Sequence, residues 1–254
     1  GIVGSPWIGF AHFQRFFKSY QFLRLIKNTL GISFYSLAAG FPVPIILAIL
    51  INEVGARRFK KTVQMVTYAP HFISTIVMVA IILQVLDPKI GLVNRVIDAT
   101  GGDPINFIGV PEYFKTIYVA SGVWQNAGYS SIIYIAALSS IDPQLEEAAI
   151  IDGASKLQKI WHIDIPGILP TAVILLILNM GRIMNIGFEK IFLMQNPLNM
   201  VASDVISTYV YRTGLVSAQY SFSAAVGLFN SVINLILIVS VNQAARRMGE
   251  TSLW

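Results

Sequence analysis

The chain has 254 residues, of which 55% are hydrophobic and only 12% are charged, and its formal net charge is +5 at pH 7. The mean hydropathy is +0.65, and the charged residues fall in short intervals between long apolar stretches, which excludes an ordinary soluble domain. Composition therefore indicates an all-α, polytopic membrane protein. Cysteine is absent, so disulfides and thiolate metal sites are excluded, and the three histidines are too scattered to suggest a metal site.

Residues 1–28 are interpreted as an external or interfacial amphipathic segment, because aromatic side chains are interleaved with Arg15, Lys18 and Arg24. Packing on the membrane surface is the preferred interpretation. The predicted topology places this segment on the outer side of the membrane, although the segment contains no apolar run long enough to bring it across. We therefore expect a further transmembrane helix upstream of residue 1, with a processed precursor as the alternative.

Residues 29–254 form the expected transmembrane domain, because five windows approach the roughly 20 apolar residues that cross a bilayer. The windows cover residues 29–51, 63–86, 116–138, 167–188 and 222–241. If these windows alternate in direction, the most basic segments between and after them share one side. Those segments contain Arg57, Arg58, Lys60, Lys61, Lys156, Lys159, Arg246 and Arg247. Because cytoplasmic loops carry an excess of positive charge, that side is predicted to be cytoplasmic.

Aromatic and amide side chains open the third window. Trp124, Asn126 and Tyr129 form a mixture that is typical of sugar-binding sites, so we count them as candidates for a substrate pathway. Aromatic residues also belong at membrane boundaries, and polar residues also hold neighbouring helices together. Both interpretations stay open for these three residues.

A charged stretch, "DPQLEEAAIIDGASKLQKIWHIDIP", separates the third and fourth windows at residues 142–166. Asp142 suits a helix N-cap and Pro143 suits the first helical position, so a short helix is expected to begin there. Gly153 can adopt a left-handed conformation that ends the helix. A second helix should follow until Pro166 ends or kinks it. The two helices would form a cytoplasmic elbow, although a plain interfacial linker is the alternative.

Arg182 is the one charged residue well inside a window. The residues that share its face at helical spacing are Asn179, Asn185 and Glu189. Because a guanidinium is costly in lipid, we assign this face to the outer half of a substrate pathway, where Arg182 could bind hydroxyls or a uronic carboxylate. An internal ion pair, with Glu189 or with an acid of a partner, is the competing interpretation. In the last window, we expect Asn230 and Asn234 to hold helices together rather than touch substrate.

The stretch "EAAIIDGASKLQKIWHIDIP" resembles the EAA motif of the permease subunits of binding-protein-dependent ABC importers. By this resemblance, residues of the first helix and its turn, with one apolar residue beyond them, would couple the chain to an ATPase. These residues are Glu147, Ala148, Ala149, Asp152, Gly153, Ala154 and Leu157. The usual phenylalanine of the second helix is Ile160 here, which keeps a large apolar side chain. Other stretches, such as "NTLGISFYSLAAGFPVPIILAILIN" and "SDVISTYVYRTG", resemble the carbohydrate-uptake branch, particularly the subgroup for oligosaccharides and polysaccharide fragments.

This resemblance implies a type I ABC importer permease fold with six transmembrane helices, five of which would lie in this chain. It implies a multi-pass protein of the bacterial cytoplasmic (inner) membrane. The implied partners are a second permease subunit, two ATPase subunits that bind ATP and Mg²⁺, an extracytoplasmic solute-binding protein and an oligosaccharide. The elbow would be the coupling helix that sits in a cleft of the ATPase. No catalytic residue, metal, cofactor or nucleic-acid partner is expected for this chain itself.

Other classes of protein fit the sequence less well. The chain contains no phosphate-binding loop of the GxxxxGK[ST] type, so it is not itself an ATPase. An ion-coupled secondary transporter would be expected to carry acidic residues near the middle of its spans, and these windows have none. A membrane enzyme would need a cluster of catalytic residues or an HExxH motif, which is also missing. A non-transporting scaffold subunit is compatible with the composition but leaves the elbow unexplained.

Overall fold

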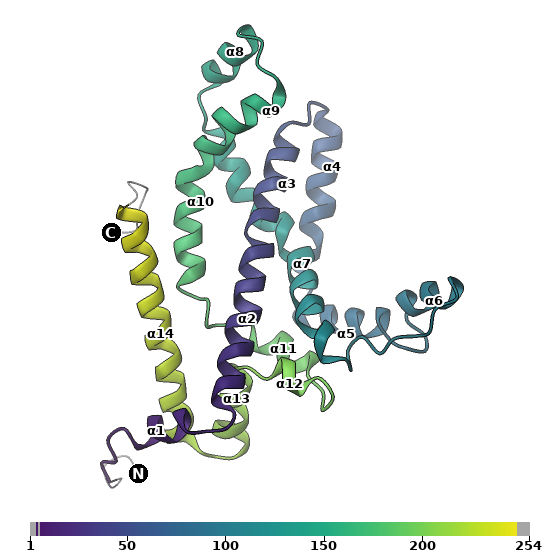
Figure 1. Cartoon of the computed structure of the whole chain (residues 1–254). Helices are drawn as coiled ribbons and strands as arrows, with labels where there is room; N and C mark the ends of the chain where they lie inside the picture. The colour runs from purple at the N-terminus through teal and green to yellow at the C-terminus, as the bar shows by residue number, and fades with distance from the viewer. Residues whose placement is uncertain (1–3, 5, 248–254) are drawn as a thin grey trace. The chain divides into compact units, whose positions relative to one another are not determined.

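The computed structural model describes Gly4 and residues 6–247, and every regular element in that part of the chain is helical (Figure 1). The α-helices are α1 Ala11–Phe17, α2 Phe22–Gly40, α3 Pro42–Asn52, α4 Arg57–Tyr68, α5 Thr75–Val85, α6 Leu92–Ala99, α7 Pro111–Ser139, α8 Pro143–Ile151, α9 Lys156–Lys159, α10 Ile165–Met180, α11 Phe188–Met194, α12 Met200–Ser203, α13 Ile206–Tyr211 and α14 Tyr220–Arg247. A 3-10 turn, Ala69–Phe72, follows α4, and π-helical turns occupy Ile160–Asp164 and Arg212–Val216. The predicted all-α class is confirmed.

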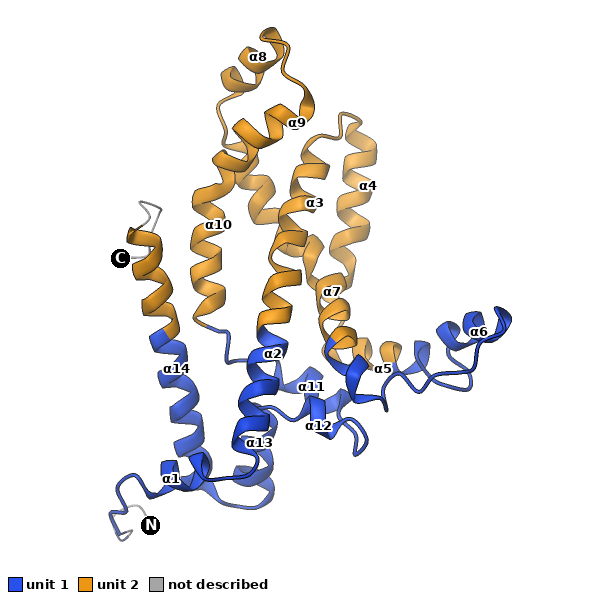
Figure 2. Cartoon of the chain, in the orientation of Figure 1, with its two compact units in different colours: residues 1–33, 83–115, 182–236 blue, residues 34–82, 116–181, 237–254 orange. Residues whose placement is uncertain are grey.

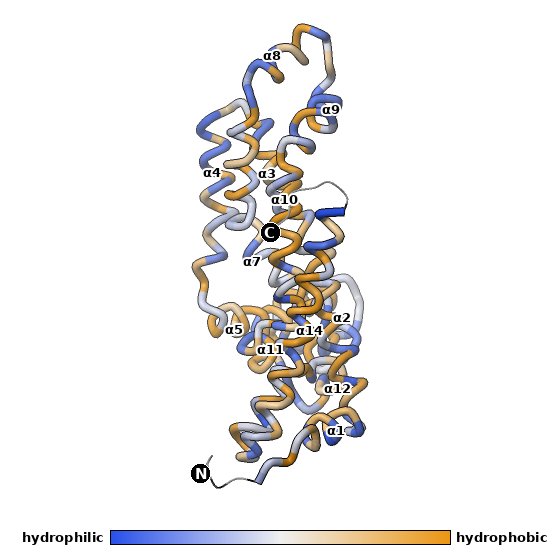
Figure 3. The backbone as a smooth tube through the Cα atoms, turned by 90° about the vertical axis from the view of Figure 1, so that its left-hand side faces the viewer, coloured by the Kyte–Doolittle hydropathy of each residue, from blue (hydrophilic) through white to orange (hydrophobic). Residues whose placement is uncertain are grey.

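Three helical stretches of the described chain are long and apolar enough to cross a membrane: Phe22–Asn52, Lys156–Met180 and Tyr220–Arg247. A bent pair of helices, Arg57–Phe72 and Thr75–Val85, provides a fourth candidate. Helix α7 coincides with the third predicted window and has 29 residues, which is more than the roughly 20 that a bilayer requires. Its polar side chains, from Glu112 to Asn126, make it less apolar than the other spans. Hydropathy is high along α10 and α14, whereas α4 and α8 contain hydrophilic stretches (Figure 3).

Two predicted windows differ from the observed helices. The second, at 63–86, was expected to be one helix, but it bends by 99° between α4 and α5. Pro70 lacks a backbone N–H and Ile73 is extended at φ −74° and ψ 127°, so the helical hydrogen bonding is interrupted there. The fourth, at 167–188, is helical only as far as Met180. The basic segment after the first window is also not a loop throughout, because α4 begins at Arg57.

The chain divides into two compact units, each assembled from three segments (Figure 2). Unit 1 comprises residues 1–33, 83–115 and 182–236, and unit 2 comprises residues 34–82, 116–181 and 237–254. Each unit therefore gathers segments that are distant in sequence.

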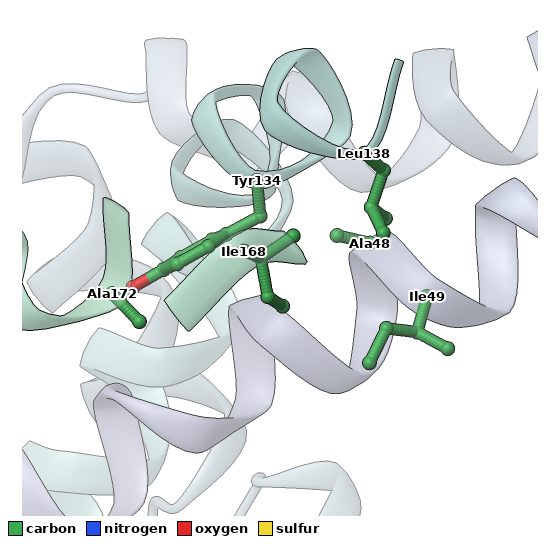
Figure 4. Packing of buried hydrophobic residues seen from close by; sticks show 6 residues of the cluster. All are labelled: Ala48, Ile49, Tyr134, Leu138, Ile168 and Ala172. Carbon is green, nitrogen blue, oxygen red and sulfur yellow. The ribbon is translucent and has the colours of Figure 1, made fainter. Parts of the chain in front are cut away.

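The core of unit 2 is formed by apolar residues of α3, α7 and α10 (Figure 4). Its buried members are Ala48, Ile49, Tyr134, Leu138, Ile168 and Ala172. Small side chains opposite large ones allow membrane helices to approach closely, which van der Waals packing rewards. A close approach of this kind occurs at Gly128 of α7, where an added Cβ would lie 2.0 Å from the backbone oxygen of Thr67. Only glycine fits that contact between α7 and α4.

A buried carboxylate organises unit 1. Asp204 is fully buried, and its Oδ1 accepts from Nη2 of Arg212 at 2.7 Å and from Oγ1 of Thr208 at 3.0 Å. Nη2 of Arg24 lies 3.4 Å from Oδ2, and the side-chain amide of Asn28 donates to the backbone oxygen of Asp204 at 3.0 Å. Because an unpaired buried carboxylate is strongly destabilising, these contacts fix the start of α13 against α2.

The N-terminal helix α1 packs on unit 1 through Phe16. This ring is only 1% exposed and contacts Phe22, Tyr209 and Phe229 at centroid separations between 5.0 and 6.2 Å. Other aromatic residues of the segment, such as Trp7, are exposed. The segment at 1–28 is predicted to pack on the membrane surface, and the contacts of Phe16 show that α1 packs on the protein itself. Its last residues belong to α2, which begins at Phe22 rather than near residue 29.

Candidate functional site

The first helix of the elbow begins as the sequence predicts. The Asp142 side chain accepts a hydrogen bond from the backbone N–H of Gln144 at 2.9 Å, and Pro143 occupies the first turn of α8. The cap satisfies one of the unpaired N–H groups at the start of the helix, and proline has none to lose there. The expected N-terminus of α8 is therefore confirmed.

The first helix ends at Gly153, which has a φ of +73°. The N–H of Ala154 donates to the oxygen of Ala149 at 2.9 Å, and the N–H of Gly153 donates to the oxygen of Ile150 at 3.1 Å. This pair of bonds is the Schellman arrangement, in which a left-handed residue closes the helix. The left-handed turn predicted at Gly153 is confirmed.

The second helix of the elbow differs from the prediction at Pro166. Ser155 and Gln158 form a capping box that starts α9, a signal readable in the sequence that the prediction did not use. A π-helical turn, Ile160–Asp164, then leads directly into α10, and the N–H of Ile165 donates to the oxygen of Ile160. Pro166 therefore does not end the helix. It occupies the first turn of α10, and the wider π-turn before it accommodates the ring.

The residues assigned to ATPase coupling lie on the surface of the elbow. Six of the seven are exposed and Ala149 is partly exposed; the exposed ones are Glu147, Ala148, Asp152, Gly153, Ala154 and Leu157. Large apolar side chains lie among them, with Ile150 71% exposed, Ile151 84% exposed and Leu157 70% exposed. Exposed apolar side chains clustered among polar ones are typical of a protein interaction site.

An ionic cluster ties the elbow to the end of α3 within unit 2. Nζ of Lys159 lies 2.5 Å from Oε1 of Glu53, 3.5 Å from Oε1 of Glu146 and 3.8 Å from Oδ2 of Asp164. Asp164 is fully buried, so Lys159 is the nearby cation that compensates its charge. Sequence reasoning missed this cluster, because Glu53 precedes Lys159 by about a hundred residues and no local pattern relates them.

Two of the three candidates on α7 meet in unit 2. The Tyr129 ring stacks on His71 with centroids 3.9 Å apart and planes 4° apart, and Nδ1 of His71 lies 3.0 Å from Oδ1 of Asn126. Trp124 is 54% exposed and makes no ring contact with any described residue. The structure thus connects Asn126 and Tyr129 through His71, a residue that sequence reasoning did not select.

The predicted helical face around Arg182 is wrong. Helix α10 ends at Met180, and the residues from Gly181 to Gly187 are not helical, so spacing along a helix does not relate Arg182 to Asn185 and Glu189. Asn179 belongs to unit 2 and the other three residues belong to unit 1. All four side chains are exposed. Among the described residues Arg182 forms no ion pair, so the pairing with Glu189 is also absent.

The two asparagines of the last span have the structural contacts that were expected. Oδ1 of Asn234 accepts from the backbone N–H of Met184 at 3.0 Å, and Nδ2 of Asn230 donates to Oδ1 of Asn185 at 2.8 Å. Both bonds join α14 to the irregular segment after α10, within unit 1. The two asparagines therefore have a structural role, although they hold α14 to an irregular segment rather than to a second helix.

Residues 40–250 match the protein family described as binding-protein-dependent transport system inner membrane component. The polygalacturonan/rhamnogalacturonan transport system permease protein YteP of Bacillus subtilis (strain 168) is 43% identical over 100% of this chain and 79% of that protein. The arabinooligosaccharides transport system permease protein AraP of the same strain is 26% identical over 90% of this chain and 74% of that protein. A chain of a bacterial alginate ABC transporter, solved with an alginate pentasaccharide-bound periplasmic protein, has a TM-score of 0.94 and 44% identity over 97% of this chain and 85% of that chain. The elbow lies inside every one of these matched regions.

Proposed function

We propose a function that follows from the family of this chain, which belongs to the binding-protein-dependent transport system inner membrane components. The chain is the permease subunit of an importer that moves an oligosaccharide across the bacterial cytoplasmic membrane. The oligosaccharide is delivered by a solute-binding protein on the outer side. A second permease subunit completes the pathway, and two ATPase subunits on the inner side supply the energy. ATP and Mg²⁺ bind to the ATPase subunits, since this chain lacks a phosphate-binding loop.

The exposed surface of the elbow is the observation that carries this proposal. Ile150 and Ile151 are exposed beside Glu147 and Asp152 on or next to α8, whose nine residues are too few to cross a membrane, and Leu157 is exposed where the next helix begins. A cleft of the ATPase would bury the apolar side chains and offer donors to the two carboxylates. The elbow would then follow the ATPase as it closes on nucleotide.

The Lys159 cluster explains how movement of the elbow reaches the transmembrane helices. Lys159 contacts Glu146 of α8 and Glu53 beyond the end of α3, and it lies in the helix that continues into α10. A displacement of α8 is therefore passed to two transmembrane stretches through one side chain. Separating Lys159 from one of its partners would leave a buried charge uncompensated, which costs free energy. The helices are therefore expected to move together rather than break the contact.

The cargo is assigned to the oligosaccharide class from the names of the relatives and from side chains in each unit. In unit 2, the stacked pair of His71 and Tyr129 offers an aromatic face beside the Asn126 amide, and Trp124 is exposed on the same helix. The remaining pathway residues, which we propose on exposure and polarity alone, are Asn179, Arg182, Asn185 and Glu189. Aromatic faces and amides together suit sugar rings and their hydroxyl groups.

Reconstitution of the full transporter tests this proposal. The chain is coexpressed with its second permease and ATPase, incorporated into proteoliposomes, and assayed for oligosaccharide uptake with the binding protein present. We expect uptake that requires ATP and is abolished by Glu147→Lys, which reverses the charge at the ATPase contact, while copurification of the two permeases is unchanged. Lys156→Glu, a charge reversal on the other elbow helix, serves as the matched control. Uptake that follows an ion gradient without ATP would favour a secondary transporter, and an intact complex without transport would favour a scaffold subunit.

A further inference from the structure

Unit 1 contains a cavity with an excess of basic side chains that the proposed function has not used. Its volume is about 710 Å³, and its lining includes Arg24, Lys27 and Asn28 of α2, Glu112 and Lys115 of α7, and Ala202 of α12. Ligand sites in proteins typically measure roughly 300–1,000 Å³. By the predicted orientation of the spans, this cavity opens on the outer side of the membrane.

The two lysines converge on the cavity without a partner of opposite charge. Neither Lys27 nor Lys115 forms an ion pair with any carboxylate of the described residues. Lys115 is partly buried, and its ammonium group lies 3.0 Å from the position that a Cβ on Gly31 would occupy. Gly31 follows Lys27 by one helical turn, so the lysine of α7 rests against the same face of α2. Like charges brought together in this way favour an anion between them.

Arg24 also lines the cavity, and its guanidinium group is only partly paired. Its Nη2 is engaged by Asp204 at 3.4 Å, but its Nε is buried and has no hydrogen-bond partner among the described residues. Asp204 is itself shared with Arg212, so it neutralises Arg24 only in part. Glu112 is the single acidic residue in the lining. The cavity therefore offers a guanidinium and two ammonium groups against one carboxylate.

We propose that this cavity is a binding site for the carboxylate groups of a uronate-containing oligosaccharide at the outer entrance of the pathway. The inference rests on the proposed function, because it assumes that the cargo is a sugar. Charged hydrogen bonds to carboxylates are about twice as strong as neutral ones, so cationic side chains select an acidic sugar over a neutral one. This ligand class agrees with the similarity of the chain to a bacterial ABC transporter that is involved in the import of the acidic polysaccharide alginate.

Cysteine protection measures the binding directly, since the chain has no cysteine of its own. Ala202→Cys places a thiol in the cavity lining, and Val96→Cys places a control thiol on α6 at a residue that is 65% exposed. The complete permease complex is labelled with uncharged N-ethylmaleimide without ATP, and only labelling of this chain is counted. At a trigalacturonate concentration of roughly ten times its apparent Kd, labelling at position 202 should slow about tenfold, because it requires the empty site. Labelling at position 96 should not change.

Two comparisons decide whether the lysines and the carboxylates are responsible. Lys27→Gln combined with Lys115→Gln should abolish the protection, whereas Lys89→Gln, the same change outside the cavity, should preserve it. Maltotriose, a neutral trisaccharide, should not protect. Equal protection by maltotriose, or no protection in a complex that still imports with ATP, would overturn the inference. Protection by the sugar-free binding protein alone would instead identify a docking site for that protein.

The labelling result separates this inference from the proposed function. Labelling needs neither ATP nor transport, so failure of ATP-driven uptake in the wild-type complex would refute the proposed function and leave protection by trigalacturonate standing. Normal ATP-driven uptake without protection would refute only the carboxylate site.

Discussion

The elbow and the Asp204 cluster both interrupt apolar helices with polar residues, but they are stabilised by contacts of different range. The first helix of the elbow with its turn, residues 142–154, is largely exposed, and its two ends are closed by bonds such as Gln144 to Asp142 and Ala154 to Ala149. Asp204 is fully buried, and two of its partners, Arg24 and Asn28, are 180 and 176 residues away in sequence. An exposed turn can take its structure from neighbouring residues, whereas a buried charge requires partners that only the folded unit brings together.

The largest expected effect of a substitution is at Asp204. Asp204→Asn keeps the shape but leaves Arg24 and Arg212 without their carboxylate, so we expect a loss of about 3 kcal/mol in the free energy of unfolding. The estimate is at the lower end for buried pairs because both arginines reach partly into solvent. Chemical denaturation in mixed micelles measures the change. Asp152→Asn, the same substitution at an exposed elbow residue, should change stability by less than about 0.5 kcal/mol. Equal effects at the two positions would show that the buried and the exposed carboxylate contribute alike to stability.

A second prediction tests packing without charge. Gly128→Ala should destabilise unit 2 by about 2 kcal/mol, because the new Cβ would lie 2.0 Å from the Thr67 backbone oxygen and α7 would have to move away from α4. Gly227→Ala, also in a helix, meets nothing within 4 Å and should be stabilising by about 0.5–1 kcal/mol. The two variants are compared by their midpoints of thermal unfolding in one detergent. Shifts of the same sign would contradict the role given to the contact.

The turn at Gly153 should respond to conformation alone. Its φ of +73° costs a residue with a Cβ about 1–2 kcal/mol, so Gly153→Ala should weaken the link between α8 and α9. We expect fewer sugar molecules imported per ATP hydrolysed, measured in proteoliposomes, with little change in expression of the complex. Asparagine tolerates the left-handed region better than alanine, so Gly153→Asn should recover much of the ratio. If alanine and asparagine behave alike, side-chain size rather than backbone conformation governs the turn.

The smallest effect is expected at the N-cap of α8. Asp142→Ala removes the acceptor for the Gln144 N–H and should cost about 0.5–1 kcal/mol of local stability, whereas Asp142→Asn retains an acceptor and should cost less. Hydrogen exchange of the amides at the start of α8 reports this change. A global loss of stability in Asp142→Ala would show that the elbow supports the whole of unit 2, contrary to the local character assigned to it.

The elbow could be predicted closely because its signals are local. An aspartate cap and a proline at the first helical position identify the start of α8, and a glycine identifies its end. The helix observed between them has nine residues. The capping box of Ser155 and Gln158 was equally readable and was missed. Pro166 was expected to end or kink the second helix, and it does not end it, because the π-turn at Ile160–Asp164 leads directly into α10 and places the proline in the first turn of that helix.

The rest of the site depends on residues that folding brings together. His71 lies beside Tyr129 because α4 packs closely on α7 where Thr67 meets Gly128, and Lys159 meets Glu53 because both belong to one unit. Arg182 illustrates the opposite error, in which a hydropathy window extended a helix that ends at Met180. Apolar composition continues past that point, since Ile183 and Met184 are buried without being helical. Hydropathy reports apolar character, and it does not distinguish a helix from an irregular apolar segment.

The π-turn at Ile160–Asp164 also fixes the angular phase between two surfaces of one continuous helix. Each residue of an α-helix advances the side chains by about 100° around the axis, and an i→i+5 turn accommodates a residue that regular winding would not. Leu157 on one side of the turn faces the exposed surface of the elbow, and Ile168 on the other side is buried in the core of unit 2. Deleting one residue between them would preserve a helix but rotate one surface against the other, so the two surfaces depend on the number of residues between them as well as on their composition.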